Sequence, residues 1–244
     1  ILVHGLLGTT LAISTQKSLT SAGLFHATAL GTGLWTFLGF KGWSLCVLYF
    51  LLGSWATKLK FAEKERNGIA ERRSGARGPE NVWGSAAAVR ATSLLLHVWI
   101  SIAVFPHQAS VLRLGYVTAI ATKLSDTFAS ELGKAFGKHT YLITSLRSVP
   151  RGTEGAVSLE GSLAGVLGSL LIAVPASALG VLPSGSHYVA ICVITALVAT
   201  TMESYIGAVY QNDRYPWLSN EWVNCIMTVI GASLAMAWQL AMSV

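Results

Sequence analysis

Eight apolar segments follow one another along the 244-residue chain, separated by polar connections. They occupy residues 1–15, 18–40, 42–57, 84–104, 109–135, 157–181, 186–210 and 220–243. About twenty apolar residues cross the hydrocarbon core of a bilayer as a helix, which satisfies its own backbone polar groups. Charged residues make up only 11% of the chain, against about 25% in soluble domains. We therefore predict an all-α, polytopic integral membrane helix bundle of about seven or eight transmembrane helices, forming one domain over residues 1–244.

Positive charge is concentrated in two connections. The first holds Lys58, Lys60, Lys64, Arg66, Arg72, Arg73 and Arg77, and the second holds Lys134, Lys138, Arg147 and Arg151. Two predicted spans separate these connections, so both emerge on one side of the membrane, and two more spans return residues 211–214 to that side. By the positive-inside tendency this face is cytosol-like, or stroma-like in a plastid. Topology or attraction to anionic lipids also explains basic loops without any site.

Acidic residues at the same face have no such topological explanation. They are Asp126, Glu131, Glu154, Glu160, Glu203 and Glu221, several of them inside apolar runs. Ionisable groups at membrane depth are costly unless they are paired or face a wet interior, so these acids indicate a functional site. The three cysteines and six histidines lack metal-ligand spacing, and we assign them to packing.

The densest polar pattern runs from residue 123 to residue 134. Positions three or four apart share a helix face, which gives one stripe of Lys123, Asp126, Thr127, Ser130 and Lys134. Glu131 lies about 140° further round the helix than Asp126. Magnesium is usually held by one or two carboxylates together with phosphate oxygens. We predict Asp126 as the first metal ligand and Glu131 as the second, with Lys123 as a further catalytic candidate. The alternative is a structural ion pair to Lys123 or Lys134.

A polar loop at residues 150–155 opens the apolar segment 157–181. Gly152 and Gly155 would let the backbone approach an oxyanion, and Arg151 can make paired hydrogen bonds to phosphate. A helix predicted to begin at about residue 157 would present amides that favour anions. The candidate phosphate-binding residues here are Arg147, Arg151, Gly152, Thr153, Glu154 and Gly155. The chain contains no Walker A sequence, dinucleotide fingerprint or protein-kinase signature.

Further candidates lie at the ends of other apolar segments. Lys58 and Lys60 close the third segment, where one side chain can extend to the lipid headgroups and the other can hold a phosphate. Glu203, inside an otherwise apolar helix, is a third metal-ligand candidate. The remaining candidates for nucleotide or phosphate binding are Ser130, Lys134, Asn220 and Asn224. For Asn224, helix packing is an equal alternative.

Five blocks of sequence carry a resemblance to a known family. They are Lys58–Lys60, Lys123–Lys138, Val149–Gly165, Glu203–Gln211 and Asn220–Asn224. In this order they resemble the plastid phytyl-phosphate kinases of the tocopherol pathway, which lie within a wider family of uncharacterised integral membrane proteins. The similarity covers nearly the whole chain. The chain departs from the pattern at Arg147, where Lys is common, and at Tyr205, where a smaller residue is common.

The resemblance implies a membrane-embedded kinase domain over residues 1–244. It implies transfer of a phosphoryl group from a nucleoside triphosphate to phytyl phosphate, giving phytyl diphosphate for tocopherol or phylloquinone synthesis. The implied cofactor is Mg²⁺, and the implied cosubstrate is CTP first, then UTP or ATP. Partners would be phytyl phosphate, membrane lipid and the nucleotide, with no nucleic acid, and a homo-oligomer is left open. The implied location is a multi-pass chloroplast membrane protein of the envelope or thylakoid.

Other functions are compatible with the same residues. A polyprenol-type lipid kinase would act on an unphosphorylated alcohol and would need Asp126 or Glu131 as a base. A cytidylyltransferase would use the same anion-binding face on a lipid phosphate. A lipid-phosphate transporter would place polar groups through the membrane midplane in several spans.

Overall fold

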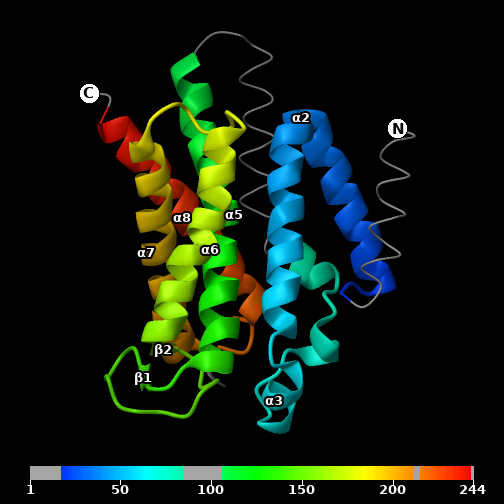
Figure 1. Ribbon diagram of the computed structural model, residues 1–244, viewed down its shortest axis with the longest axis vertical. Coiled ribbons are helices and arrows are strands. Elements are labelled where there is room, and N and C mark those ends of the chain that lie inside the picture. The colour runs from blue at the N-terminus through cyan, green and yellow to red at the C-terminus, as the bar shows by residue number, and fades with distance from the viewer. Residues whose placement is uncertain (1–17, 85–105, 212–214, 243–244) are drawn as a thin grey trace.

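The computed structural model describes residues 18–84, 106–211 and 215–242. These contain helices α2 (Ser21–Lys58), α3 (Phe61–Arg66), α5 (Pro106–Phe136), α6 (Leu159–Ala178), α7 (Ser186–Tyr210) and α8 (Asn220–Ala241). They also contain a 3₁₀ turn, η1 (Arg72–Gly75), and two short strands, β1 (Thr140–Leu142) and β2 (Ala156–Ser158). The long helices stand side by side as a bundle (Figure 1). The predicted all-α membrane bundle is therefore confirmed, with a two-stranded sheet as a small addition.

Four helices of the described residues are long and apolar enough to cross a membrane, namely α2, α6, α7 and α8. Gly39 interrupts α2 with a positive φ of 63°, and the helix folds there into two arms (Figure 1). These arms correspond to the predicted segments 18–40 and 42–57. Segment 1–15 and nearly all of segment 84–104 lie outside the described residues, so the count of seven or eight spans stays a prediction.

Helix α5 occupies the centre of the bundle. It packs against α2, α6, α7 and α8, and every residue from Leu114 to Phe128 is buried. The core around it is apolar, with Tyr116, Leu124 and Phe128 at 0–1% exposure. The polar residues of α5 therefore face neighbouring helices instead of lipid, which is the arrangement that ionisable groups at this depth require.

Small residues bring α6 into direct contact with α5. A Cβ atom added at Gly161 would lie 2.7 Å from the Ala129 carbonyl oxygen, and one added at Gly168 would lie 2.7 Å from that of Leu124. Their spacing in the sequence is typical of closely packed membrane helices. The close packing fixes the position of the polar stripe on α5 relative to α6.

The basic connections share one end of the bundle. There α3, the β1–β2 sheet, the end of α7 and the start of α8 lie together (Figure 1), as the loop pattern predicted. One boundary was wrong: α6 begins at Leu159, not near residue 157, because residues 156–158 pair antiparallel with 140–142. Ser158 then caps α6, accepting a hydrogen bond at 3.1 Å from the Gly161 N–H.

Candidate functional site

A cavity of about 740 Å³ opens at this end of the bundle. Helices α5, α6, α7 and α8, the segment 70–77 and the loop 152–158 all contribute to its wall. Most of the predicted site residues line it: Lys123, Asp126, Ser130, Glu131, Lys134, Gly152, Thr153, Glu154, Gly155, Glu203, Asn220 and Asn224. Predicted residues up to 101 positions apart, Lys123 and Asn224, thus share one polar cavity of the size that ligand pockets have.

Lys123 joins α5 to α8 inside this cavity. Its ammonium donates at 2.6 Å to Asp126 Oδ2 and at 2.7 Å to Asn224 Oδ1. The three residues are each only 8% exposed, so the ion pair and the amide offset part of the cost of burying charge. The ion pair between Lys123 and Asp126, which was the structural alternative in the sequence, is present. Asp126 still lines the cavity, and pairing does not remove its second oxygen as a ligand.

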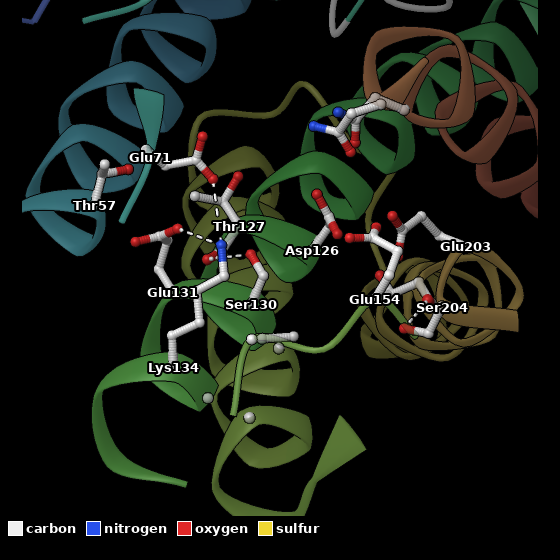
Figure 2. Close-up of a pocket in the computed structure, with 18 of the residues that line it drawn as sticks. Thr57, Glu71, Asp126, Thr127, Ser130, Glu131, Lys134, Glu154, Glu203 and Ser204 are labelled. Carbon is white, nitrogen blue, oxygen red and sulfur yellow. Dashed lines mark hydrogen bonds and ion pairs between the residues drawn. The ribbon is translucent and has the colours of Figure 1, made fainter. Parts of the chain in front are cut away.

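Three carboxylates converge on the cavity from three different elements. Asp126 from α5, Glu154 from the loop and Glu203 from α7 point toward one another (Figure 2). Their charges interact, since both Asp126 and Glu154 act electrostatically on Glu203. Gln211 orients the loop carboxylate: its side-chain amide donates to Glu154 at 2.9 Å and accepts from the Asn220 N–H at 3.2 Å.

These carboxylates could supply part of a magnesium site, with the other ligands coming from a substrate phosphate and water. Within the described ranges, no three side chains of His, Cys, Asp or Glu form a ready-made metal site. Magnesium keeps several waters and takes one or two carboxylates together with substrate phosphates. The donor chemistry of Asp126 and Glu203 meets that requirement, provided that a phosphate ligand supplies the remaining oxygens.

Glu131 belongs to a second charge network, separate from Asp126. It is 2% exposed, forms an ion pair with Lys64 of α3 and lies 3.5 Å from the ammonium of Lys134. Lys64, itself 1% exposed, also donates to the Thr57 carbonyl at 2.8 Å. Lys134 reaches on to Glu71 at 3.4 Å (Figure 2). The angular offset between Asp126 and Glu131 on α5 explains why they bind different lysines.

The network attaches the segment 61–78 to α5. Desolvation alone would raise the pKa of the Glu71 carboxyl, but the charge and hydrogen bond of Lys134 lower it below its ordinary value. Glu71 therefore stays ionised at neutral pH and holds the segment beside the cavity. Neither Lys64 nor Glu71 was among the predicted site residues. Their partners lie 67 and 63 positions away, and no local pattern signals such a pairing.

The glycines of the 150–155 loop serve protein contacts. Gly152 and Gly155 have φ values of +84° and +71°, which favour glycine. A Cβ at Gly152 would lie 2.5 Å from Ile69, and one at Gly155 would lie 2.4 Å from the Ala208 Cβ. Thr153 donates its hydroxyl to the Pro150 carbonyl at 2.8 Å. Although these residues line the cavity, the space next to the glycines is filled by side chains of the segment 61–78 and of α7.

Four predicted phosphate-binding residues do not line the cavity: Lys58, Lys60, Arg147 and Arg151. Lys60 and Arg151 both donate to the Ala135 carbonyl, at 3.2 and 3.5 Å. Cations at a helix C-terminus stabilise its last carbonyls, so these two hold the end of α5. Lys58 donates to Ser18 at 3.0 Å, and the Arg147 side chain is exposed.

Three arginines that the sequence marked only as loop charges do line the cavity. Arg72, Arg73 and Arg77 come from η1 and the residues that follow it. Arg73 forms an ion pair with Glu80 and donates to Asn81 at 3.0 Å. The cavity therefore combines guanidinium groups with converging carboxylates, a combination suited to phosphate together with a divalent cation.

Comparison with known proteins places this chain in a wider group. Residues 5–232 match the family described as integral membrane protein DUF92. An uncharacterized membrane protein of Synechocystis is 49% identical over 92% of this chain and 84% of its own length. An uncharacterized membrane protein of Methanocaldococcus jannaschii is 31% identical over 91% of this chain and 86% of its own length.

A plant relative also matches nearly the whole chain. The chloroplastic protein VTE6 of Arabidopsis thaliana is 42% identical over 91% of this chain, which spans 65% of the plant protein. No solved structure matches the chain. The relatives thus come from a plant, a cyanobacterium and an archaeon.

Proposed function

The chain belongs to the DUF92 family of integral membrane proteins, and we propose that it is a magnesium-dependent phytyl-phosphate kinase. The reaction would convert phytyl phosphate and a nucleoside triphosphate into phytyl diphosphate and a nucleoside diphosphate. The observation that carries the proposal is the cavity in which Asp126, Glu154 and Glu203 converge (Figure 2). Arg72, Arg73 and Arg77 also line this cavity. The motif blocks that resemble plastid phytyl-phosphate kinases, and the similarity to a chloroplastic plant protein, support it.

The charges of the cavity suit a reaction between two anions. The second pKa of a phosphate monoester is about 6, so a lipid monophosphate is mostly a dianion at neutral pH. An oxygen of the lipid phosphate can attack the γ-phosphorus of the nucleotide directly. The bond from that phosphorus to the oxygen that bridges it to the β-phosphate then breaks, and the nucleoside diphosphate leaves. No strong base is needed, which agrees with the pairing of Asp126 and Glu131 with lysines. The main requirement is to offset repulsion between the two substrates, about 4 kcal/mol per pair of unit charges at 4 Å and a dielectric of 20.

Each group in the cavity has a part in this proposal. Asp126, with Glu203 or Glu154, would hold Mg²⁺, which neutralises charge on the phosphates and orients them. Lys123 orients Asp126 through its 2.6 Å hydrogen bond, and Asn224 holds Lys123 in place. Lys134 and the arginines of the segment 70–77 would bind phosphate oxygens. Glu131 would act indirectly, by holding Lys64 and Lys134.

The membrane setting fits the lipid part of the substrate. Burying a CH₂ group is favourable by about 0.8 kcal/mol, so a C20 chain stays among apolar helices while its phosphate stays at the polar end. The nucleotide would enter from the aqueous side, and CTP is the first expectation, followed by UTP or ATP. A plastid membrane is the location that the resemblance implies.

Product formation by purified protein in liposomes tests the proposal. Phytyl phosphate and phytol are supplied separately, each with Mg²⁺ and with CTP, UTP, GTP or ATP. We expect phytyl diphosphate from phytyl phosphate alone, and none after Mg²⁺ is chelated. Product from phytol alone would favour the polyprenol-type kinase. Movement of phytyl phosphate across the bilayer without any nucleotide use would favour a transporter and contradict the proposal.

A further inference from the structure

The backbone of Arg77, a loop residue, is fixed by hydrogen bonds to the residues that precede α2. Its N–H donates to the Ser18 carbonyl at 2.9 Å, and its own carbonyl accepts from the Thr20 N–H at 3.0 Å. The start of α2 packs directly on this backbone, since a Cβ at Gly23 would lie 2.3 Å from the Arg77 oxygen. The backbone from which the side chain extends is therefore fixed on both sides.

The side chain of Arg77 is positioned just as closely. One guanidinium nitrogen donates to the Tyr49 hydroxyl at 2.8 Å, and the guanidinium carbon lies 5.2 Å from the centre of the same ring. A Cβ at Gly53 would lie 2.8 Å from the other terminal nitrogen. The absence of a side chain at Gly53 thus makes room for the guanidinium, and Tyr49 orients it against α2.

The charge of Arg77 has no carboxylate partner among the described residues, where every ion pair up to 4.0 Å involves other cations. Its neighbour Arg73 is paired with Glu80, while Lys123 and Lys134 are paired with acids of the site. A guanidinium has five N–H donors, and those not used by Tyr49 remain for another acceptor. Arg77 lines the cavity, so that acceptor can be an anionic ligand.

Its depth indicates which substrate the anion belongs to. Tyr49 and Gly53 precede Lys58, the last residue of α2, by nine and five positions. At a rise of about 1.5 Å per residue these positions lie about 14 and 8 Å below the end of the helix. A phosphate attached to a membrane-embedded chain can reach that level, whereas the nucleotide arrives at the loops above it.

We propose that Arg77 binds the phosphate group of the lipid monophosphate, and that Tyr49 and Gly53 orient its guanidinium for this contact. The inference rests on the proposed function for the identity of the lipid. The same chemistry could serve a phosphate of the nucleotide, and the test separates the two sources. Arg77 contacts substrate in this proposal, while Tyr49 and Gly53 are positioning residues.

The test measures binding to the full chain in detergent, without turnover. The probes are phytyl phosphate, phytol and CTP with Mg²⁺, and the variants are Arg77→Met and Arg77→Lys. We expect Arg77→Met to raise the Kd for phytyl phosphate roughly tenfold to a hundredfold, as loss of charged hydrogen bonds does. The Kd values for phytol and CTP should not change. Arg77→Lys should lose less affinity, because it keeps the charge but not the paired donors.

Arg66→Met is the matched control, because Arg66 is exposed and does not line the cavity. Among the described residues, its side chain donates only to the Ala62 carbonyl of its own helix, at 3.2 Å. It should bind all three probes as the unmodified protein does. An unchanged Kd for phytyl phosphate in Arg77→Met, or an equal loss for phytol or for CTP, would overturn the inference. If Arg77→Met does not fold, Arg77→Lys decides, and unchanged phytyl-phosphate affinity there overturns it.

This binding assay also separates the inference from the proposed function. If the unmodified protein binds phytyl phosphate through Arg77 but forms no diphosphate, the kinase proposal fails and the phosphate contact stands. If it forms diphosphate while Arg77 variants bind phytyl phosphate normally, only the contact is overturned.

Discussion

Asp126 and Glu131, the two carboxylates of α5, are paired with different lysines, and this difference indicates different roles. Asp126 has one lysine on its own helix and faces the cavity with Glu154 and Glu203. Glu131 is nearly fully buried between Lys64 and Lys134. A carboxylate bound by two ammonium groups is a poor metal ligand, whereas one that shares a cavity with other acids is a good one. We therefore propose that the chemistry depends on Asp126 and that Glu131 supports the structure around it.

Replacing Asp126 by Asn tests the first role. The amide can still accept from Lys123, so folding should be nearly unchanged, but the negative charge required by a metal is lost. We expect product formation in liposomes to fall by at least about a hundredfold, on the scale of losing one strong electrostatic contact to the transition state. Glu65→Gln, at an exposed residue outside the cavity, is the control and should keep full activity. Turnover at the unmodified rate by folded Asp126→Asn protein would disprove the metal-ligand assignment.

Replacing the buried pair tests the second role. Lys64→Met alone leaves Glu131 with a single, longer contact, and should lower stability by about 3–5 kcal/mol. In the double variant Lys64→Met/Glu131→Leu no buried charge is unpaired, so stability should return toward that of the unmodified protein. Activity should recover with it. A stable but inactive double variant would instead place Glu131 at the metal, as the sequence alone suggested.

Some site residues could be predicted from the sequence and others could not, for a physical reason. Asp126 and Glu203 stand out because a charge inside an apolar helix is costly and needs a function. Arg151 attracted attention by its glycine neighbours, yet it binds the end of α5. Arg77 is one of seven similar cations in the first basic connection, and the sequence does not distinguish it from the other six. Its role depends on Tyr49 and Ser18, which are distant in sequence.

At the level of elements, the contact between α5 and α6 sets the shape of the cavity. Long apolar runs predicted both helices well, because twenty such residues in a bilayer have few alternatives to a helix. The strands β1 and β2 escaped prediction, since three residues carry no recognisable alternation. The position of the segment 61–78 also escaped it, because that position depends on the pairing of Lys64 with Glu131 across the fold.

The same substitution at two glycines should have opposite effects. Gly168→Ala places a Cβ 2.7 Å from the Leu124 carbonyl and should destabilise the protein by about 1–3 kcal/mol through overpacking. Gly33→Ala meets nothing within 4 Å and should stabilise α2 by up to about 1 kcal/mol. Unfolding of the purified protein by a denaturing detergent measures both. Equal effects of the two variants would contradict the close packing of α5 against α6.

Acid should release the segment that carries Glu71. The pKa of Glu71 is lowered in the folded protein because Lys134 outweighs desolvation. Its pairing therefore contributes stability above the ordinary pKa of a glutamate and loses it as the pH falls through the lowered value. The protection of residues 69–77 from hydrogen exchange, expressed relative to the intrinsic exchange rate at each pH, should fall between about pH 5 and pH 3. Glu71→Gln should exchange faster at neutral pH and respond less to acid, and an identical pH response in both proteins would contradict this.

On the scale of the whole molecule, the fold places the described residues of the cavity at one end of a membrane bundle. Cysteines introduced at Asn67 and Ser145, both exposed at that end, should therefore react with an impermeant thiol reagent from the same side of the membrane. Ser184→Cys, in the turn between α6 and α7, should react only from the other side. The experiment uses protein in which Cys46, Cys192 and Cys225 are replaced. Labelling of all three sites from one side would contradict the topology.

The destination of the γ-phosphate tests the account most directly. Purified protein in liposomes receives phytyl phosphate, Mg²⁺ and CTP labelled with ³²P in the γ-position, or whichever nucleotide it uses best. We predict that the label moves to phytyl diphosphate with an equal amount of nucleoside diphosphate, and that Asp126→Asn prevents this. Label released as pyrophosphate, with the nucleotide joined to the lipid, would identify a cytidylyltransferase, and label that never leaves the nucleotide would contradict phosphoryl transfer altogether.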